Sequence, residues 1–404
     1  MARPADPPEA WTGGLVAGER FPGRWTDVNV FFPHAGSVAA IRAQRPDLVV
    51  FNGDQYYETV PTGPVRAPAA AALEDLWHRV LLWHWSFRDL TRDRPTVVLL
   101  DDHDVYHPNL WGWEGRPTVN ANTGGYVMPP TWINAVQAML CGHLPDPYDP
   151  TPVSQGIGVI YTAFRHGPVN FAVLEDRKFK TGDKDELGPD GAPFPPEILT
   201  LLGSRQEDFL DWWATQDPGA VKICLHQSPF VSMKTGPTGF ARRDADSNGY
   251  PASGRRSALT RLQEAGAVLV SGDQHLAAVM HHGIDGDEDG PWEFAAPALG
   301  TLFQLWFEPN PPLPGATLPG TGRFTDPYGN RTQVEAVAGP KVSFSTLAAA
   351  RTGQVVPDRR LKQDGYGMVV VDPTAHTVTF ECWPHTGPGQ GQYPGWPVTV
   401  DVGP

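Results

Sequence analysis

Three short loops carry carboxylate and imidazole side chains directly after apolar runs: Gly53-Asp54, Asp101-Asp102-His103 and Asp273-Gln274-His275. Oxygen ligands of this kind, together with a few imidazoles, suit Ca, Mg, Mn or Fe(III), whereas cysteine-rich sets suggest zinc. Two or more such ions neutralise charge on phosphoryl oxygens and make hydroxide available near neutral pH. The loops therefore predict a metal-dependent hydrolase of phosphoric esters.

Asp54 is the first metal ligand that we expect, because Gly53 before it lets the backbone turn sharply toward an ion. Tyr57 is either a phenolate ligand or a packed aromatic side chain. Asp102 stands in a run of three carboxylates around one imidazole, and their repulsion requires a cation or a basic partner. A metal ion provides that relief, and a solvated acidic turn is the alternative.

His103 is either a ligand or the group that protonates the departing oxygen, and we favour the proton donor. Asp273 and His275 are alternate residues, so in an extended segment both side chains point the same way and clasp one ion. His226 follows another apolar run and is a further candidate ligand or a structural imidazole. Arg177 is a bidentate phosphate clamp or a member of an internal ion pair.

Short apolar runs precede all of these residues and predict buried strands. The runs are Leu48–Phe51, Thr96–Leu100, Val169–Leu174, Val221–Leu225 and Ala267–Val270. Helical patterns lie between them at Ala69–Leu90, Ser204–Gln216 and Ser257–Ala265, the second opening with a capping box, Ser204-x-x-Glu207. This alternation predicts α/β layering, in which ligands collect beyond the carboxyl ends of the strands.

The chain from residue 283 onward is rich in proline and glycine, especially over Pro309–Gly322. It ends in short β-like runs at Gly367–Val371 and Val378–Cys382. We interpret 283–404 as a loop-rich completing β layer, so that 1–404 is a single domain. The stretch Pro108–Pro130, rich in Trp, Gly and Asn, is expected to form an ordered loop near the site.

Composition narrows the choice of partners. The chain has 45 acidic and 31 basic residues, a formal charge of −14 and no dense Lys/Arg run, which argues against a polymeric nucleic acid and leaves a small phosphorylated substrate. The three cysteines have no CxxC spacing, so we expect buried free thiols.

Neither an apolar leader nor a stretch of about 18 apolar residues is present. This predicts a cytoplasmic protein without membrane contact, export remaining open if the natural N-terminus lies upstream. The oligomeric state is left unknown.

The ordered set Asn52-Gly-Asp-Gln-Tyr-Tyr-Glu58, Asp101-Asp-His-Asp-Val105, Glu175-Asp-Arg177 and Ser271-Gly-Asp-Gln-His275 resembles the PhoD-like alkaline phosphatases of the calcineurin-like metallophosphoesterase superfamily. The resemblance implies a four-layer αββα fold, two stacked mixed sheets flanked by helices. It also implies a centre of two or more metal ions, iron(III) with calcium, or manganese or zinc. On this resemblance Asp54 bridges metals, Tyr57 binds iron, Asp102 takes the place of a ligand Asn, His103 is catalytic, and Asp273 and His275 are the late ligand pair.

Two features depart from that family. Its first motif normally supplies an early ligand, often from a Ser-Cys pair, and here the comparable piece is Asp27-Val-Asn29, so Asp27 or Asn29 would fill that position. The N-terminal β-domain of many relatives is also absent. Two other functions therefore stay open: a degenerate, non-catalytic metal-binding protein, and a hydrolase of another bond on the same metal platform.

Overall fold

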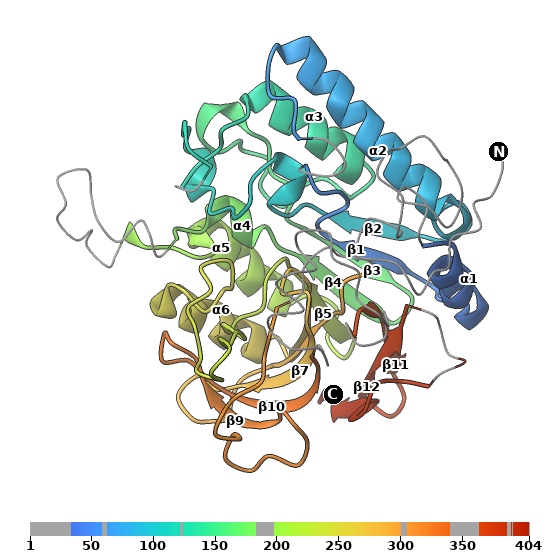
Figure 1. Cartoon of the computed structure of the whole chain (residues 1–404), viewed down its shortest axis with the longest axis vertical. Helices are drawn as coiled ribbons and strands as arrows, with labels where there is room; N and C mark the ends of the chain where they lie inside the picture. Colours follow the sequence, from blue (N-terminus) through green and yellow to red (C-terminus); the bar gives the residue numbers. More distant parts are fainter. Residues whose placement is uncertain are drawn as a thin grey trace.

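The structure is a computed structural model, and it describes residues 34–58, 63–121, 124–182, 198–299, 305–339, 363–385, 389 and 391–403. The strands in these ranges form three sheets, which Figure 1 shows at the centre and lower part of the molecule. Within the same ranges, none of the helices combines the length and the apolar character that a membrane span requires.

The largest sheet is mixed and has the strand order β3-β4-β5-β6-β8-β7-β10-β9 among the described residues. Its centre, β4-β5-β6-β8, is parallel, and the outer strands pair antiparallel. The strand bounds are β3 Thr162–His166, β4 Val169–Val173, β5 Val221–Leu225, β6 Ala267–Ser271, β7 Ala277–His282, β8 Trp292–Ala295, β9 Gly322–Thr325 and β10 Arg331–Ala338.

The second layer contains two small sheets. Strands β1 (Val49–Asn52) and β2 (Thr96–Leu99) pair in parallel, and β11 (Gly365–Asp372), β12 (Thr377–Pro384) and β13 (Val398–Asp401) form an antiparallel sheet. Side chains of both small sheets share one buried core with the large sheet. This core includes Leu99, Phe171, Ile223, Phe294 and Phe380.

Helices cover the outer faces of the two layers, as Figure 1 shows. Next to β1 and β2 lie α1 (Ala35–Gln44), α2 (Ala69–Thr91) and α3 (Pro130–Cys141), whereas α5 (Gly203–Ala214) and α6 (Ala252–Glu264) pack together beside β6. The predicted α/β fold with two stacked sheets and flanking helices is confirmed. All five predicted strands are present, and so are the two predicted C-terminal β runs, within β11 and β12.

Two details of the helix prediction were wrong. Helix α5 begins at Gly203, and no side-chain capping hydrogen bond is found at its start among the described residues, so Ser204 and Glu207 form no capping box. Helix α6 begins at Ala252, five residues before the predicted start, directly after the extended Pro251. The predicted start missed this turn because Ser253 and Gly254 favour loops in isolation; here Gly254 packs against Leu201.

Candidate metal centre

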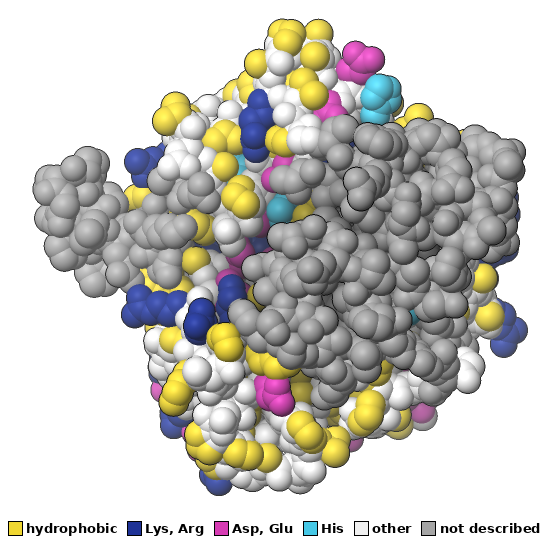
Figure 2. All heavy atoms as spheres, viewed as in Figure 1, with side chains coloured by type: hydrophobic (Ala, Val, Ile, Leu, Met, Phe, Trp, Pro, Cys, Tyr) yellow, Lys and Arg dark blue, Asp and Glu magenta, His cyan; other side chains and the backbone are white. Residues whose placement is uncertain are grey.

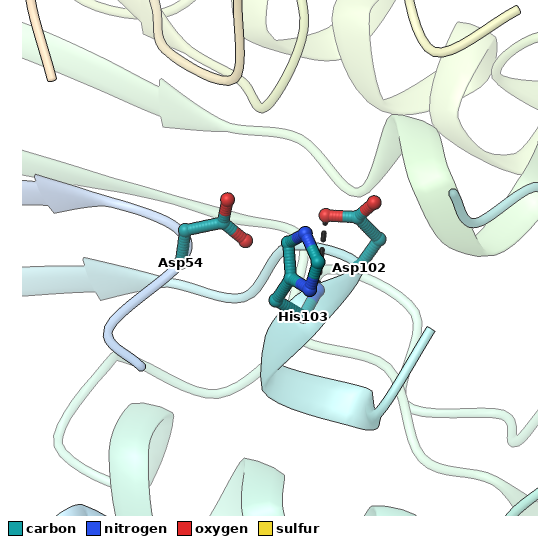
Figure 3. Close-up of side chains that lie close together, drawn as sticks. All are labelled: Asp54, Asp102 and His103. Carbon is teal, nitrogen blue, oxygen red and sulfur yellow. Dashed lines mark hydrogen bonds between the residues drawn. The ribbon is translucent and has the colours of Figure 1, made fainter. Parts of the chain in front are cut away.

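The loops after β1, β2 and β6 meet beyond the carboxyl ends of these strands, each of which has a parallel neighbour. Two groups of donor atoms form there, each with all its atoms within 4.8 Å of one another. One group is Asp54, Asp102 and His103, and the other is Asp101, Asp102 and Asp273. Asp102 belongs to both groups. Figure 3 shows the side chains of Asp54, Asp102 and His103 turned toward a common space.

The approach of the first two loops depends on Gly53. Its backbone has a φ of +93°, and a Cβ atom at this position would lie 2.4 Å from Cβ of Asp101. No side chain fits in that gap. Asp54, which follows, has a φ of 54°, an uncommon value for a non-glycine residue, and such backbone strain concentrates at functional sites.

Asp104 connects the loops after β1 and β2 through hydrogen bonds to their backbone. Its buried carboxylate accepts backbone N–H groups of Asp54, Gln55 and Asp101, each at 3.0 Å. Burial and the nearby Asp54 raise the pKa of Asp104. The three peptide N–H groups oppose this increase in the pKa of Asp104 without cancelling it. Asp101 and Asp102 face the centre.

Tyr57 and His275 complete the side of the site that belongs to Asp54. The Tyr57 hydroxyl lies 2.9 Å from Oδ2 of Asp54 and 2.5 Å from Nε2 of His275, and that nitrogen is 3.7 Å from the same carboxylate oxygen. Burial alone would raise the pKa of Asp54, but His103, His275 and Tyr57 hold it well below its usual range. Asp54 is therefore a carboxylate at neutral pH, as a metal ligand must be.

His103 is fixed through its Nδ1 atom, which lies 2.6 Å from Oε2 of the buried Glu58. Burial lowers the pKa of His103, but Asp102, Asp54 and Glu58 together raise it to about 10. In the metal-free site the ring is thus a cation at neutral pH. Because Glu58 holds Nδ1, Nε2 is the nitrogen that remains for a substrate or a metal ion.

Arg177 lies in α4 (Asp176–Phe179) and is almost fully buried. Its guanidinium contacts three carboxylates: Nε is 2.6 Å from Asp101, Nη1 is 2.7 Å from Asp246 and Nη2 is 2.5 Å from Asp273. Of the two interpretations of this residue, the structure shows the internal ion pair. A phosphate clamp would require the guanidinium to release at least one of these partners.

The site has acceptors that no described group satisfies. Oδ1 of Asp54 and Oδ2 of Asp101 are buried and have no hydrogen-bond partner among the described residues. Buried oxygens of this kind normally find a donor or a cation. Burial also raises the pKa of Asp101 and Asp102, an effect that a bound cation would reverse. An oxygen-rich set with one phenol and two imidazoles therefore fits a hard metal ion.

Asp273 and His275 reach the site without the extended conformation that the sequence suggested. Strand β6 ends at Ser271, and Asp273 and His275 have left-handed φ values of 62° and 52° instead of an extended conformation. As a result the two side chains take different partners. Asp273 contacts Arg177, whereas His275 contacts Tyr57.

His226 is not brought into either donor group. Its carbonyl accepts the Asn52 side chain at 2.9 Å, but its buried ring points into a separate polar cluster, 3.4 Å from Glu293 and 4.0 Å from Asp176. The structural alternative for His226 fits this placement. The two candidates for the early ligand, Asp27 and Asn29, lie outside the described residues.

Two residues of the site went unassigned in the sequence. Glu58 follows Tyr57 directly, and its place in that motif was the available signal. Asp246 lies in the long segment between β5 and α6, and no apolar strand precedes it. Burial raises the pKa of Asp246 to about 6 in spite of the neighbouring Arg177. Among the described residues, Asp54, Tyr57, Asp273 and His275 also line a cavity of about 1470 Å³.

Comparison with known proteins gives one family and two structures of similar fold. The model of the PhoD-like phosphatase family matches residues 29–302. A structure of PhoD has a TM-score of 0.53 and 16% identity, covering 91% of this chain and 65% of that one. A purple acid phosphatase from yellow lupin (Lupinus luteus) seeds has a TM-score of 0.50 and 11% identity, covering 92% and 49%. No curated protein matches the chain. The chain thus spans about two thirds of the first structure's length and half of the second's.

Proposed function

Because the chain belongs to the PhoD-like phosphatase family, we propose that it hydrolyses phosphoric esters at a metal centre formed by Asp54, Asp102 and Asp273. The observation that carries this proposal is that two donor groups share Asp102. A carboxylate that belongs to two donor groups could hold two cations close together, as a two-metal hydrolase requires. The unsatisfied buried oxygens of Asp54 and Asp101 support it.

Tyr57 and His275 would complete the position at Asp54, and Asp101 and Asp273 the position at Asp102. Bound metal ions would supply charge neutralisation for the phosphoryl oxygens and a water of lowered pKa. The protein would hold these ions rigidly, because Gly53 and Asp104 fix the relative placement of the loops.

His103 is the residue that we assign to protonation of the leaving group. Glu58 orients its ring through Nδ1, which leaves Nε2 for the substrate oxygen. The same side chain could instead serve as a ligand, since a ring nitrogen belongs to the donor group of Asp54 and Asp102. The two roles differ in effect: a lost proton donor slows turnover, whereas a lost ligand weakens metal binding.

For the metals we propose iron(III) at the position of Tyr57 and calcium at the other, with manganese or zinc as the alternatives. The phenol of Tyr57 beside a carboxylate supports iron(III), which binds phenolate well, and the carboxylate-only group supports a hard divalent cation. A phenolate bound to iron(III) absorbs visible light by charge transfer. Colour that disappears in Tyr57→Phe would identify this ligand independently of activity.

One observation favours a second candidate, a metal-binding protein without hydrolytic activity. Arg177 already neutralises Asp101 and Asp273, two of the three carboxylates in the second donor group. The guanidinium of Arg177 therefore competes with a metal ion for these two carboxylates. If the guanidinium keeps them, only one metal ion binds and the two-metal arrangement does not form. A hydrolase of another bond is the remaining alternative, because a metal platform does not fix its substrate.

The test is reconstitution of the metal-free protein with iron and calcium, with manganese, or with zinc. Metal content and hydrolysis of p-nitrophenyl phosphate and bis-p-nitrophenyl phosphate are then measured. We expect about two ions per chain and turnover of at least one ester. Asp54→Asn should lose both, whereas the control Asp93→Asn, an exposed residue paired with Arg92, should lose neither. Stoichiometric metal without hydrolysis of either ester would favour the second candidate.

A further inference from the structure

A short hairpin lies in the long segment between β5 and α6. Lys234 and Arg242 are opposite each other in it, since the backbone N–H of Arg242 donates to the carbonyl of Lys234 at 2.9 Å. Thr235 and Ala241 form the next antiparallel bridge. The hairpin is held in place, because the N–H of Thr235 donates to the carbonyl of Trp306 at 2.8 Å. Its side chains are therefore presented on a pre-organised backbone, which lowers the entropic cost of binding.

The two basic side chains lie on the same face of this hairpin. A Cβ atom at Gly236 would lie 2.4 Å from Nε of Arg242 and 2.7 Å from its Cζ, so the guanidinium covers the face on which that Cβ would stand. Lys234 is two residues before Gly236, and alternate residues of an extended segment point the same way. Lys234 and Arg242 thus form one patch of positive charge, which we call the hairpin cation pair.

The same face leads to the proposed metal centre through Asp244. Nζ of Lys234 lies 3.5 Å from Oδ1 of Asp244. The other oxygen of that carboxylate is 3.4 Å from Nε2 of Gln274, which donates to Oδ2 of Asp273 at 3.1 Å. Figure 2 shows Lys and Arg side chains lying next to Asp and Glu side chains over the region of α6. The hairpin cation pair is therefore beside the donor groups, with the side chains of Asp244 and Gln274 in between.

The charge of Arg242 is not compensated. The residue is exposed, and its guanidinium has no hydrogen bond or ion pair within the part of the chain that the structure describes. The exposed Arg256, by contrast, pairs with Asp285. Like charges directly opposite each other in a β ladder destabilise it, and Asp244 neutralises only Lys234. An anion that contacts both cations would relieve this repulsion.

The patch is limited to these two cations. Phe240, whose carbonyl accepts the N–H of Gly236 at 3.0 Å, is 69% exposed, so the hairpin becomes apolar beyond the cation pair. Arg243 alternates to the other face, where its guanidinium lies 5.4 Å from the centre of the Tyr328 ring. Nucleic acids bind to longer rows of Lys and Arg that follow the phosphate backbone. The hairpin cation pair therefore suits a small anion.

We propose that Lys234 and Arg242 form a subsite for a second anionic group of the substrate. The planar fork of a guanidinium matches phosphate and carboxylate oxygens, and the ammonium of Lys234 has donors left after its contact with Asp244. The preferred substrate is then a phosphoric ester whose leaving group carries a further phosphate or carboxylate. The metal centre holds the scissile phosphoryl group, and the subsite holds the other anion. This inference rests on the proposed hydrolysis for the reacting group, whereas binding at the subsite is measured without turnover.

Calorimetric titration of the metal-reconstituted full chain tests the proposal. The probes are alkane diphosphonates of increasing length and alkyl monophosphonates of matching length, whose C–P bonds resist ester hydrolysis. We expect a diphosphonate of suitable length to bind about tenfold tighter than its monophosphonate, because hydrogen bonds between charged groups are among the strongest. Phosphonates that end in a carboxylate distinguish the two kinds of second anion. Added salt should reduce the preference, since both cations are accessible to solvent.

Variants of the hairpin test which residues provide the subsite. Arg242→Gln should abolish the preference for diphosphonates, because it removes the charge and keeps a polar side chain. Lys234→Gln should reduce the preference. Phe240→Ala, on the same face but without a change of charge, is the matched control and should keep the preference of the native protein. Circular dichroism and metal content verify that each variant is folded and loaded.

Two outcomes would overturn the subsite. One is that diphosphonates bind no better than monophosphonates at any length, and the other is a preference that survives in Arg242→Gln. Failure of the proposed hydrolysis gives a different result. A preference for diphosphonates that Arg242→Gln abolishes, without turnover of p-nitrophenyl phosphate or bis-p-nitrophenyl phosphate, would support the subsite and reject the reaction.

Discussion

Arg177 and Asp273 are joined by a hydrogen bond of 2.5 Å from Nη2 to Oδ1, which places a permanent positive charge beside the proposed metal centre. The same guanidinium also contacts Asp101 and Asp246, so one buried and two partly buried carboxylates depend on one cation. Arg177 therefore holds the acidic site together before any metal binds. It also connects α4 and the long segment before α6 to the loop after β6.

Replacing Arg177 by methionine should destabilise the metal-free protein by about 3–5 kcal/mol, because the buried Asp101 and two partly buried carboxylates lose their counter-charge. Chemical unfolding in the presence of a chelator measures this loss. The control is Arg331→Met, which removes an exposed pair with Asp287 and should cost less than about 1 kcal/mol. A variant of unchanged stability but raised KM would instead make Arg177 a substrate clamp.

Asp104 gives a second prediction, since its carboxylate accepts three backbone N–H groups from two loops. Asparagine in its place turns one acceptor into a donor that faces those N–H groups. We expect Asp104→Asn to lower the free energy of unfolding by about 1–3 kcal/mol and to weaken metal binding. Urea unfolding and metal titration measure the two effects, with Asp93→Asn as the exposed control. Normal metal affinity in a destabilised Asp104→Asn would show that loop placement does not depend on this carboxylate.

The convergence of the three loops could be predicted from the sequence because each follows a short apolar run, and carboxyl ends of parallel strands share an edge. Strand position alone does not determine which way a side chain points. His226 follows β5 as expected, but its ring enters the cluster around Glu293 and leaves only its carbonyl near Asn52. Asp273 and His275 likewise reach the site through residues with left-handed backbone angles. The alternation of side chains along an extended strand does not predict such a turn.

Other features depend on contacts between distant segments and leave no local signal. Asp246 joins the site through contacts with distant residues, among them Arg177, which lies 69 residues earlier. The early start of α6 depends on packing of Gly254 against Leu201. Single-domain organisation and the early ligands Asp27 and Asn29 stay predictions from the sequence.

Glu58 gives a prediction about the pH dependence of turnover. Its carboxylate contributes to the raised pKa of His103, together with Asp102 and Asp54. Glu58→Gln should lower that pKa, and a general acid is active only while it is protonated. We therefore expect the alkaline limb of the kcat profile to move to lower pH, and the metal content to stay unchanged. An alkaline limb that does not move would argue against His103 as the proton donor.

Lys180 gives a prediction about stability and pH. Its buried ammonium donates to the carbonyls of Asp246 and Ser247 at 2.6 Å each, and burial followed by the nearby Arg177 lowers its pKa to about 8. The unfolded chain keeps this proton up to about pH 10.5, the ordinary value for lysine. Between these two values the unfolded state binds more protons, so stability rises with pH.

The cost of burying the charge of Lys180 is thus fully present below pH 8 and is lost as the pH approaches 10.5. We expect the native protein to gain up to about 3 kcal/mol over this window relative to Lys180→Met, which has no group to titrate there. Urea unfolding of both proteins at a series of pH values, with metal removed, measures the difference. Lys234→Met, at a half-buried lysine paired with Asp244, should follow the native curve. Parallel curves for the native protein and Lys180→Met would show that the folded state keeps the proton on Lys180 through this range.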